Sequence, residues 1–94
     1  MVRSPAADDR SWGVFAQALG NNLQRLRLAR DMSQEHVAYA AGLSRYTYQK
    51  YEKGESRPGT GANPSLRVLL ALAQVLDVGL GEIVPQDAPD LKAH

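Results

Sequence analysis

A regular spacing of large apolar side chains marks the first third of the chain. Four of them, at intervals of four, four and three residues, are Phe15, Leu19, Leu23 and Leu26. Because an α-helix repeats about every 3.6 residues, this spacing puts all four on one helical face. The pattern predicts a helix that begins near Ser11 or Trp12 and ends near Arg30. We expect residues 1–11 to form a mobile tail.

A shorter helix, capped by Ser33 and followed by a tight turn, is predicted next. Small and branched apolar residues share one face of residues 34–41, namely Val37, Ala38 and Ala41. Gly42 suits the left-handed conformation that ends a helix, and Leu43 supplies the apolar contact that usually accompanies it. Ser44 can cap the next helix by accepting hydrogen bonds from the free amides of its first turn.

The next predicted helix, residues 45–52, has two different faces. Tyr48 and Tyr51 are three residues apart and face the same core as the preceding helix. The opposite face carries polar and phenolic groups, from Arg45, Tyr46, Gln49 and Lys50. Two short helices clasped around a tight turn form the helix-turn-helix pattern.

A break and two further helices complete the predicted fold. The stretch from Lys53 to Asn63 contains three glycines and a proline and cannot continue a helix. Asn63 as cap and Pro64 as first helical residue predict a fourth helix that runs to about Asp77. A short fifth turn is expected over residues 79–84.

The predicted fourth helix is apolar on more than one face. One stripe suits the core of the domain: Leu66, Leu69, Leu70, Ala73 and Leu76. A second stripe lies opposite, at Val68, Leu72 and Val75. A helix that is apolar all round is normally buried all round, so this second stripe needs a cover. Either a partner subunit covers it, or the N-terminal residues Trp12, Val14 and Phe15 fold back over it.

Taken together, these segments resemble the phage-repressor and Cro-type (XRE-like) family of helix-turn-helix regulators. The resemblance extends from Leu19 to Val84 and rests on LGNNLQRLRLARDMSQEHVAYAAGLS, YEKG and NPSLRVLLALAQVLDV. It implies an all-α, five-helix, repressor-like DNA-binding domain. Members of the family commonly dimerise through their last helices, which favours a partner subunit as the cover for Val68, Leu72 and Val75.

The third predicted helix is expected to read DNA. An α-helix fits the major groove and its N-terminal residues reach base edges, which favours a DNA-contact role over a merely solvated face. Arg45 suits guanine and Gln49 suits adenine, whereas Tyr46 could meet a thymine methyl group or a phosphate. The expected base contacts are Arg45, Tyr46, Gln49 and Lys50. The expected phosphate contacts are Gln34, Ser44, Thr47, Lys53 and Arg57.

Other residues are expected to be structural. The resemblance implies a buried pair of Arg27 and Glu52 that fixes the third helix against the first. Tyr48 departs from the branched aliphatic residue usual in the family, so either the core is enlarged there or the phenol reaches a polar edge. Gly42 and Tyr51 complete the structural set.

Composition narrows the class of protein further. At 94 residues the chain has room for one domain, expected over residues 12–85 with a C-terminal tail over 86–94. It contains no cysteine, and its two histidines, His36 and His94, have no companions at metal-ligand or catalytic spacing. We therefore expect no enzyme, metal or cofactor. No apolar run suits a signal peptide or a membrane helix, so a cytoplasmic protein is expected.

The net charge of +1 is a weak indication of DNA binding, but its distribution is informative. Lys and Arg outnumber Asp and Glu between residues 12 and 60, where the motif lies, whereas acids outnumber bases over residues 85–94. We predict a sequence-specific transcriptional regulator that binds double-stranded DNA as a homodimer. The alternative is an antitoxin-type module that binds a protein as well as its own promoter.

Overall fold

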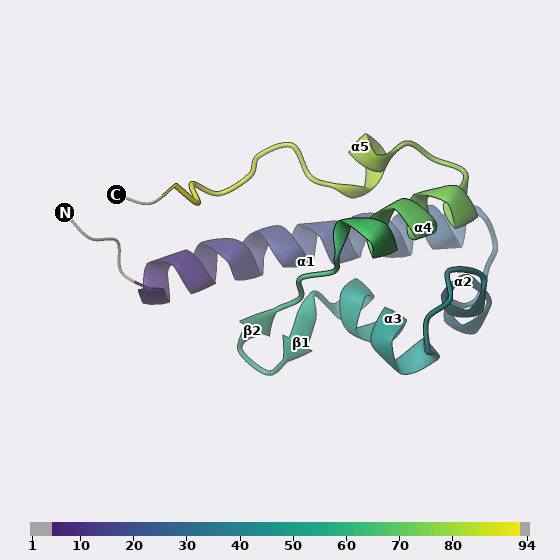
Figure 1. Ribbon diagram of the computed structural model, residues 1–94, viewed down its shortest axis with the longest axis horizontal. Coiled ribbons are helices and arrows are strands. Elements are labelled where there is room, and N and C mark those ends of the chain that lie inside the picture. Colours follow the sequence, from purple (N-terminus) through teal and green to yellow (C-terminus); the bar gives the residue numbers. More distant parts are fainter. Residues whose placement is uncertain (1–4, 93–94) are drawn as a thin grey trace.

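The chain folds around one long helix. The computed structural model describes residues 5–92, and its elements are α1 (Pro5–Ala29), α2 (Gln34–Ala40), α3 (Arg45–Lys53), β1 (Glu55–Arg57), β2 (Thr60–Gly61), α4 (Leu66–Leu76) and α5 (Leu80–Ile83). α2, α3 and the strands lie along one side of α1, while α4 and α5 close the other side of the core (Figure 1). The predicted all-α fold of five helices is confirmed, with a two-stranded antiparallel hairpin added.

The first helix begins earlier than predicted. α1 begins at Pro5 rather than near Ser11 or Trp12, so residues 5–11 of the expected mobile tail are helical. Residues 1–4 and 93–94 of the two expected tails lie outside the described residues. Residues 86–92 form neither helix nor strand, and the C-terminal segment runs back along α1 (Figure 1).

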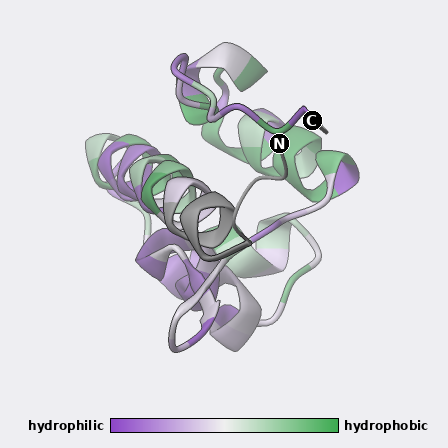
Figure 2. Cartoon of the chain, turned by 90° about the vertical axis from the view of Figure 1, so that its left-hand side faces the viewer, coloured by the Kyte–Doolittle hydropathy of each residue, from purple (hydrophilic) through white to green (hydrophobic). Residues whose placement is uncertain are grey.

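The core contains three of the four apolar residues predicted to share one face of α1, whereas Phe15 lies outside the core cluster, beside Trp12. Leu19, Leu23 and Leu26 pack there with side chains from the other helices, which are Val37, Ala38, Tyr48, Leu72, Ala73, Leu76 and Ile83. Figure 2 shows the contrast between the layers, with hydrophobic residues dominating the region of α4 and hydrophilic residues the region of α3. One face of α3 is therefore free for polar side chains.

The structure corrects two expectations for α4. Ser65, not Asn63, is its N-cap, because the Ser65 Oγ accepts from the amide of Val68 at 3.1 Å and Pro64 stays outside the helix. Leu72 is fully buried, and Val68 and Val75 pack partly buried against the same core. The predicted interface through Val68, Leu72 and Val75 is therefore wrong, since this stripe faces the domain's own interior.

The other edge of the α4 apolar surface is exposed instead. Leu66 has 62% and Leu70 43% of its surface exposed, although both were assigned to the core-facing stripe. The apolar arc of this helix is wider than the core it meets, so one edge remains in solvent. The sequence pattern alone does not show which edge that is.

The segment between α3 and α4 is a β-hairpin instead of an irregular loop. Glu55 pairs with Gly61 and Arg57 with Thr60, around a Pro58-Gly59 turn in which Gly59 has φ +80°. Proline followed by a residue with positive φ is the pattern of a type II turn. Trp12 of α1 packs on this hairpin and does not fold back over α4, which rules out that cover for the Val68 stripe.

Candidate nucleic-acid interface

Two capped helices and a tight turn present α3 at the surface. The Ser33 Oγ accepts from the amide of His36 at 3.0 Å and caps α2, as predicted from the sequence. After α2 the chain turns at Gly42, which has φ +76°. The Ser44 Oγ then accepts from the amide of Thr47 at 3.1 Å and starts α3. The predicted helix-turn-helix geometry is confirmed.

The outward face of α3 carries the predicted base-contacting side chains together. Arg45, Tyr46 and Gln49 are exposed and Lys50 is half-buried. The ammonium group of Lys50 lies 4.4 Å from the centre of the Tyr46 ring, a cation–π contact that orders both side chains. The four residues form one continuous polar surface, and their contact with DNA remains a prediction.

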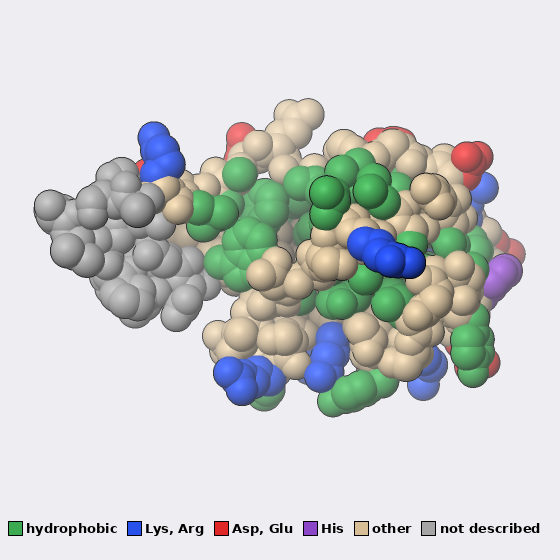
Figure 3. All heavy atoms as spheres, viewed as in Figure 1, with side chains coloured by type: hydrophobic (Ala, Val, Ile, Leu, Met, Phe, Trp, Pro, Cys, Tyr) green, Lys and Arg blue, Asp and Glu red, His purple; other side chains and the backbone are tan. Residues whose placement is uncertain are grey.

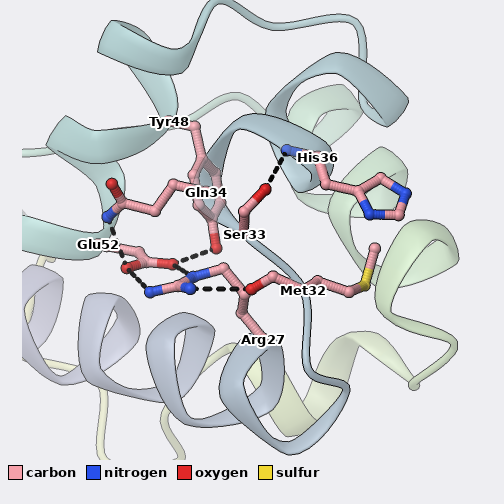
Figure 4. A network of polar contacts seen from close by, with 7 residues as sticks. All are labelled: Arg27, Met32, Ser33, Gln34, His36, Tyr48 and Glu52. Atoms are coloured by element: carbon pink, nitrogen blue, oxygen red, sulfur yellow. Dashed lines mark hydrogen bonds and ion pairs between the residues drawn. The ribbon is translucent and has the colours of Figure 1, made fainter.

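The inward face of α3 is fixed by a buried ionic network (Figure 4). The Arg27 Nε donates to Glu52 Oε2 at 2.6 Å and Nη2 donates to Oε1 at 3.1 Å, a bidentate pair. The Arg27 Nη1 donates to the carbonyl oxygen of Met32 at 2.9 Å. One side chain of α1 thus ties together the end of α3 and the start of the loop before α2. The predicted Arg27–Glu52 pair is confirmed.

Two further donors complete the hydrogen bonding of Glu52. The Tyr48 hydroxyl donates to Oε2 and the Gln34 Nε2 donates to Oε1 at 3.0 Å. Of the two possibilities for Tyr48, the phenol reaches a polar edge. Gln34, expected to contact a phosphate, directs its amide nitrogen into this network and so braces the end of α3. A phosphate contact would use the backbone N–H of Gln34, at the start of α2, or the second hydrogen on its Nε2.

The ionisation of this network follows from its contacts. Burial alone would raise the pKa of Glu52, but hydrogen bonds from Arg27, Tyr48 and Gln34 outweigh burial and keep it below its ordinary value. Burial and the hydrogen bond to Glu52 raise the pKa of Tyr48 well above its usual range. The hydrogen bond to Glu52 raises the pKa of Arg27. The pair is charged and the phenol neutral at physiological pH.

The other predicted phosphate contacts lie around α3. The Ser44 hydroxyl donates to Thr47 Oγ1 at 3.0 Å. The Thr47 hydroxyl is the acceptor in this bond, so its own proton can be donated to another group. Lys53 is exposed at the end of α3 and Arg57 is exposed on β1. Lys and Arg side chains gather along the edge formed by α3 and the hairpin (Figure 3). These side chains border the same surface as the predicted base contacts.

Sequence reasoning missed Trp12 and the hairpin it holds. The indole Nε1 donates to the carbonyl oxygen of Ala62 at 3.1 Å, across 50 residues of sequence. The Pro58-Gly59 pair, flanked by Arg57 and Thr60, was the available signal for a tight turn and hence for a hairpin. Its contact with Trp12 depends on tertiary packing and leaves no local pattern.

This surface and its scaffold define a helix-turn-helix DNA-binding domain. The chain belongs to the helix-turn-helix domain family, whose model matches residues 18–84. Its relatives place it among XRE-like DNA-binding transcriptional regulators. The family predicted from the motifs is confirmed.

Two relatives illustrate the likeness. The cryptic phage CTXphi transcriptional repressor RstR of Vibrio cholerae is 34% identical over 64 residues, which cover 68% of this chain and 52% of RstR. The chain thus spans about half the length of that relative. The crystal structure of the restriction-modification controller protein C.AhdI from Aeromonas hydrophila superposes with a TM-score of 0.63 and 34% identity, covering 72% of this chain and 94% of C.AhdI. By their names, both are regulators rather than enzymes.

Over residues 5–92 no helix is long and apolar enough to span a membrane. In the same part of the chain no three His, Cys, Asp or Glu side chains come together as metal ligands.

Proposed function

We propose that this protein is a cytoplasmic, sequence-specific transcriptional regulator that binds a two-fold related operator as a homodimer, with α3 in the major groove. The observation that carries the proposal is the two-sided character of α3. Its outward face gathers Arg45, Tyr46, Gln49 and Lys50, while its inward face is locked to α1 by the Arg27–Glu52 pair. A polar helix held this rigidly loses little conformational freedom on binding, which favours specific contacts.

The proposed contacts follow from side-chain chemistry. The Arg45 guanidinium matches the O6 and N7 acceptors of guanine, and the Gln49 amide matches N6 and N7 of adenine. Tyr46 and Lys50 border these two, toward a thymine methyl group or the neighbouring bases. Phosphates on either side meet Gln34, Ser44, Thr47, Lys53 and Arg57. Phosphate contacts set the register of the helix, and base contacts set the sequence.

The exposed edge of α4 is the proposed subunit contact. Leu66 and Leu70 line one shallow depression with Arg67, Ala71 and Gln74. Burying Leu66 and Leu70 against another apolar surface is more favourable than leaving them in water. The same surface on a second copy of the chain can bury them in a two-fold symmetric contact. A dimer can place two α3 helices about 34 Å apart, one for each half-site.

The test is selection of bound sites from random duplex DNA, together with sedimentation of the free protein. The proposal expects an enriched motif made of two inverted half-sites whose centres are about 10 base pairs apart. It also expects a dimer in solution or on DNA. If no motif is enriched above the starting pool while the protein remains folded, DNA reading by α3 is refuted.

A further inference from the structure

The hairpin forms a second wall beside α3. A groove of about 280 Å³ separates them, lined on one side by Tyr46, Gln49, Lys50 and Lys53 and on the other by Glu55, Ser56, Arg57 and Pro58. Three of these side chains are cationic and one is acidic. The Glu55 Oε2 accepts from the amide of Gly59 at 3.2 Å, so this carboxylate is engaged within the hairpin. The groove is concave, positively charged and continuous with the proposed base-reading face.

The hairpin is held in place by α1. The Trp12 indole nitrogen bonds to the Ala62 carbonyl, and the ring lies directly against Gly61. A Cβ built on Gly61 would lie 2.8 Å from Trp12 Cδ1, a distance that side chains do not tolerate. The amide of Ala62 also donates to the carbonyl of Gly54 at 2.9 Å, which closes the base of the hairpin. The second wall therefore has a fixed position relative to α3.

We propose that α3 and the hairpin straddle one sugar-phosphate strand of the DNA, with Arg57 inserted in the minor groove next to the major groove that α3 reads. This role of Arg57 replaces the phosphate contact proposed for it above. This inference rests on the proposed function and adds a second reading element to it. The strand between the two grooves would occupy the cationic groove, with Lys50 and Lys53 on its major-groove side. Arg57 lies on the far wall, directly before the Pro58-Gly59 turn.

The chemistry favours DNA as the occupant and Arg57 as the minor-groove residue. A single strand carries one negative charge per phosphate, which matches three cations around a narrow groove. A guanidinium is drawn to a narrow minor groove because the negative potential is concentrated there, especially over A·T pairs. A two-residue turn is slim enough to follow Arg57 to the groove edge. An acidic protein segment would also attract the three cations. It has no major groove for α3 and no minor groove for Arg57, so it would use only part of this surface.

The direct test uses the full 94-residue chain and its selected duplex, flanked by A·T pairs, in anisotropy titrations. Arg57→Ala should weaken binding about tenfold. Arg25→Ala, which removes an exposed arginine of α1 that lines neither the groove nor the proposed subunit contact, should leave affinity unchanged and serves as the matched control. Equal affinities of the two variants would overturn the proposal. A wild-type chain that enriches no duplex would instead refute the proposed function, before any variant is compared.

Modified bases separate minor-groove reading from simple charge attraction. Replacing adenine by 2,6-diaminopurine in the flanks adds an amino group to the minor groove and leaves the major-groove edge of the pair intact. On the modified duplex the affinity of wild type should fall by about the factor that Arg57→Ala loses on the unmodified duplex. The affinity of Arg57→Ala should not fall further on the modified duplex. If diaminopurine weakens both proteins equally, or neither, Arg57 does not lie in the minor groove.

The positioning role of Trp12 has its own readout. Trp12→Phe keeps a ring beside Gly61 but removes the N–H donor, so binding should fall about fivefold without a change in the preferred half-site. In the Arg57→Ala background the same substitution should have no further effect, because its only route to DNA is through the hairpin. An equal loss in both backgrounds, or an altered half-site, would overturn this coupling.

Discussion

Removing Arg27 tests how α3 is held. Arg27→Met keeps most of the aliphatic stem but deletes the bidentate bond to Glu52 and the bond to the Met32 carbonyl. The side chains of Arg27 and Glu52 are only 11% and 5% exposed, so little water can replace the lost donor. Breaking one side of a buried ion pair costs about 3–5 kcal/mol. Because Gln34 and Tyr48 still donate to Glu52, we expect the lower end, about 3 kcal/mol.

The assay is thermal and urea unfolding of three variants followed by circular dichroism. For a domain of this size, 1 kcal/mol corresponds to about 4–8 °C, so Arg27→Met should melt more than about 10 °C below wild type. The double variant Arg27→Met with Glu52→Leu should recover much of the lost stability, since an apolar pair leaves no buried charge unpaired. If the losses of the single variants simply add in the double variant, the two side chains do not interact and the reasoning is refuted.

The pH dependence gives an independent check of the same network. In wild type the pKa of Glu52 lies below its ordinary value, so the native state binds fewer protons than the unfolded state as the pH falls. The stabilising contribution of Glu52 is present above its ordinary pKa of 4.5 and is lost as the pH drops through the lower pKa of the folded state. In Arg27→Met, burial without the guanidinium should raise that pKa. The stability deficit of the variant should therefore shrink toward acidic pH, and a constant deficit would contradict this account.

Four further substitutions test the close packing, the reading face and the subunit contact. Gly20→Ala should destabilise the domain, because its Cβ would lie 2.4 Å from the backbone oxygen of Glu52. Gly13→Ala has no atom within 4 Å of the new Cβ and should stabilise the helix by about 1 kcal/mol. Chemical unfolding of both variants tests this difference. Arg45→Ala should cost about 1–3 kcal/mol on the specific site and leave nonspecific binding nearly intact in parallel titrations, whereas equal losses would make Arg45 a phosphate contact. Leu70→Glu should sediment as a folded monomer that binds a full operator weakly, and a variant that stays dimeric would exclude this edge of α4.

Local chemistry explains which parts could be predicted from the sequence. The serine caps of α2 and α3 and the Gly42 turn depend on residues only a few positions apart, so their pattern is visible in the chain. The faces of α4 were assigned wrongly because an apolar arc wider than the core has no unique inward direction. Leu72 and Leu70 exchange roles once the neighbouring helices are in place.

Contacts between distant segments account for the rest. The Arg27–Glu52 pair could be expected only from the family resemblance, while the Gln34 and Tyr48 donors that complete it emerged from the packing of α2 and α3. The hairpin could not be separated from an irregular loop, since its stability depends on Trp12 of α1.

The most direct measurement of the central claim is the binding of wild type and Arg45→Ala to the selected duplex with single guanines replaced by 7-deazaguanine. This base lacks the N7 acceptor in the major groove and keeps its minor-groove edge. One replacement per half-site should weaken wild type about tenfold or more and should not weaken Arg45→Ala further. If no replacement matters, or if the loss is equal in both proteins, α3 does not read the major groove through Arg45.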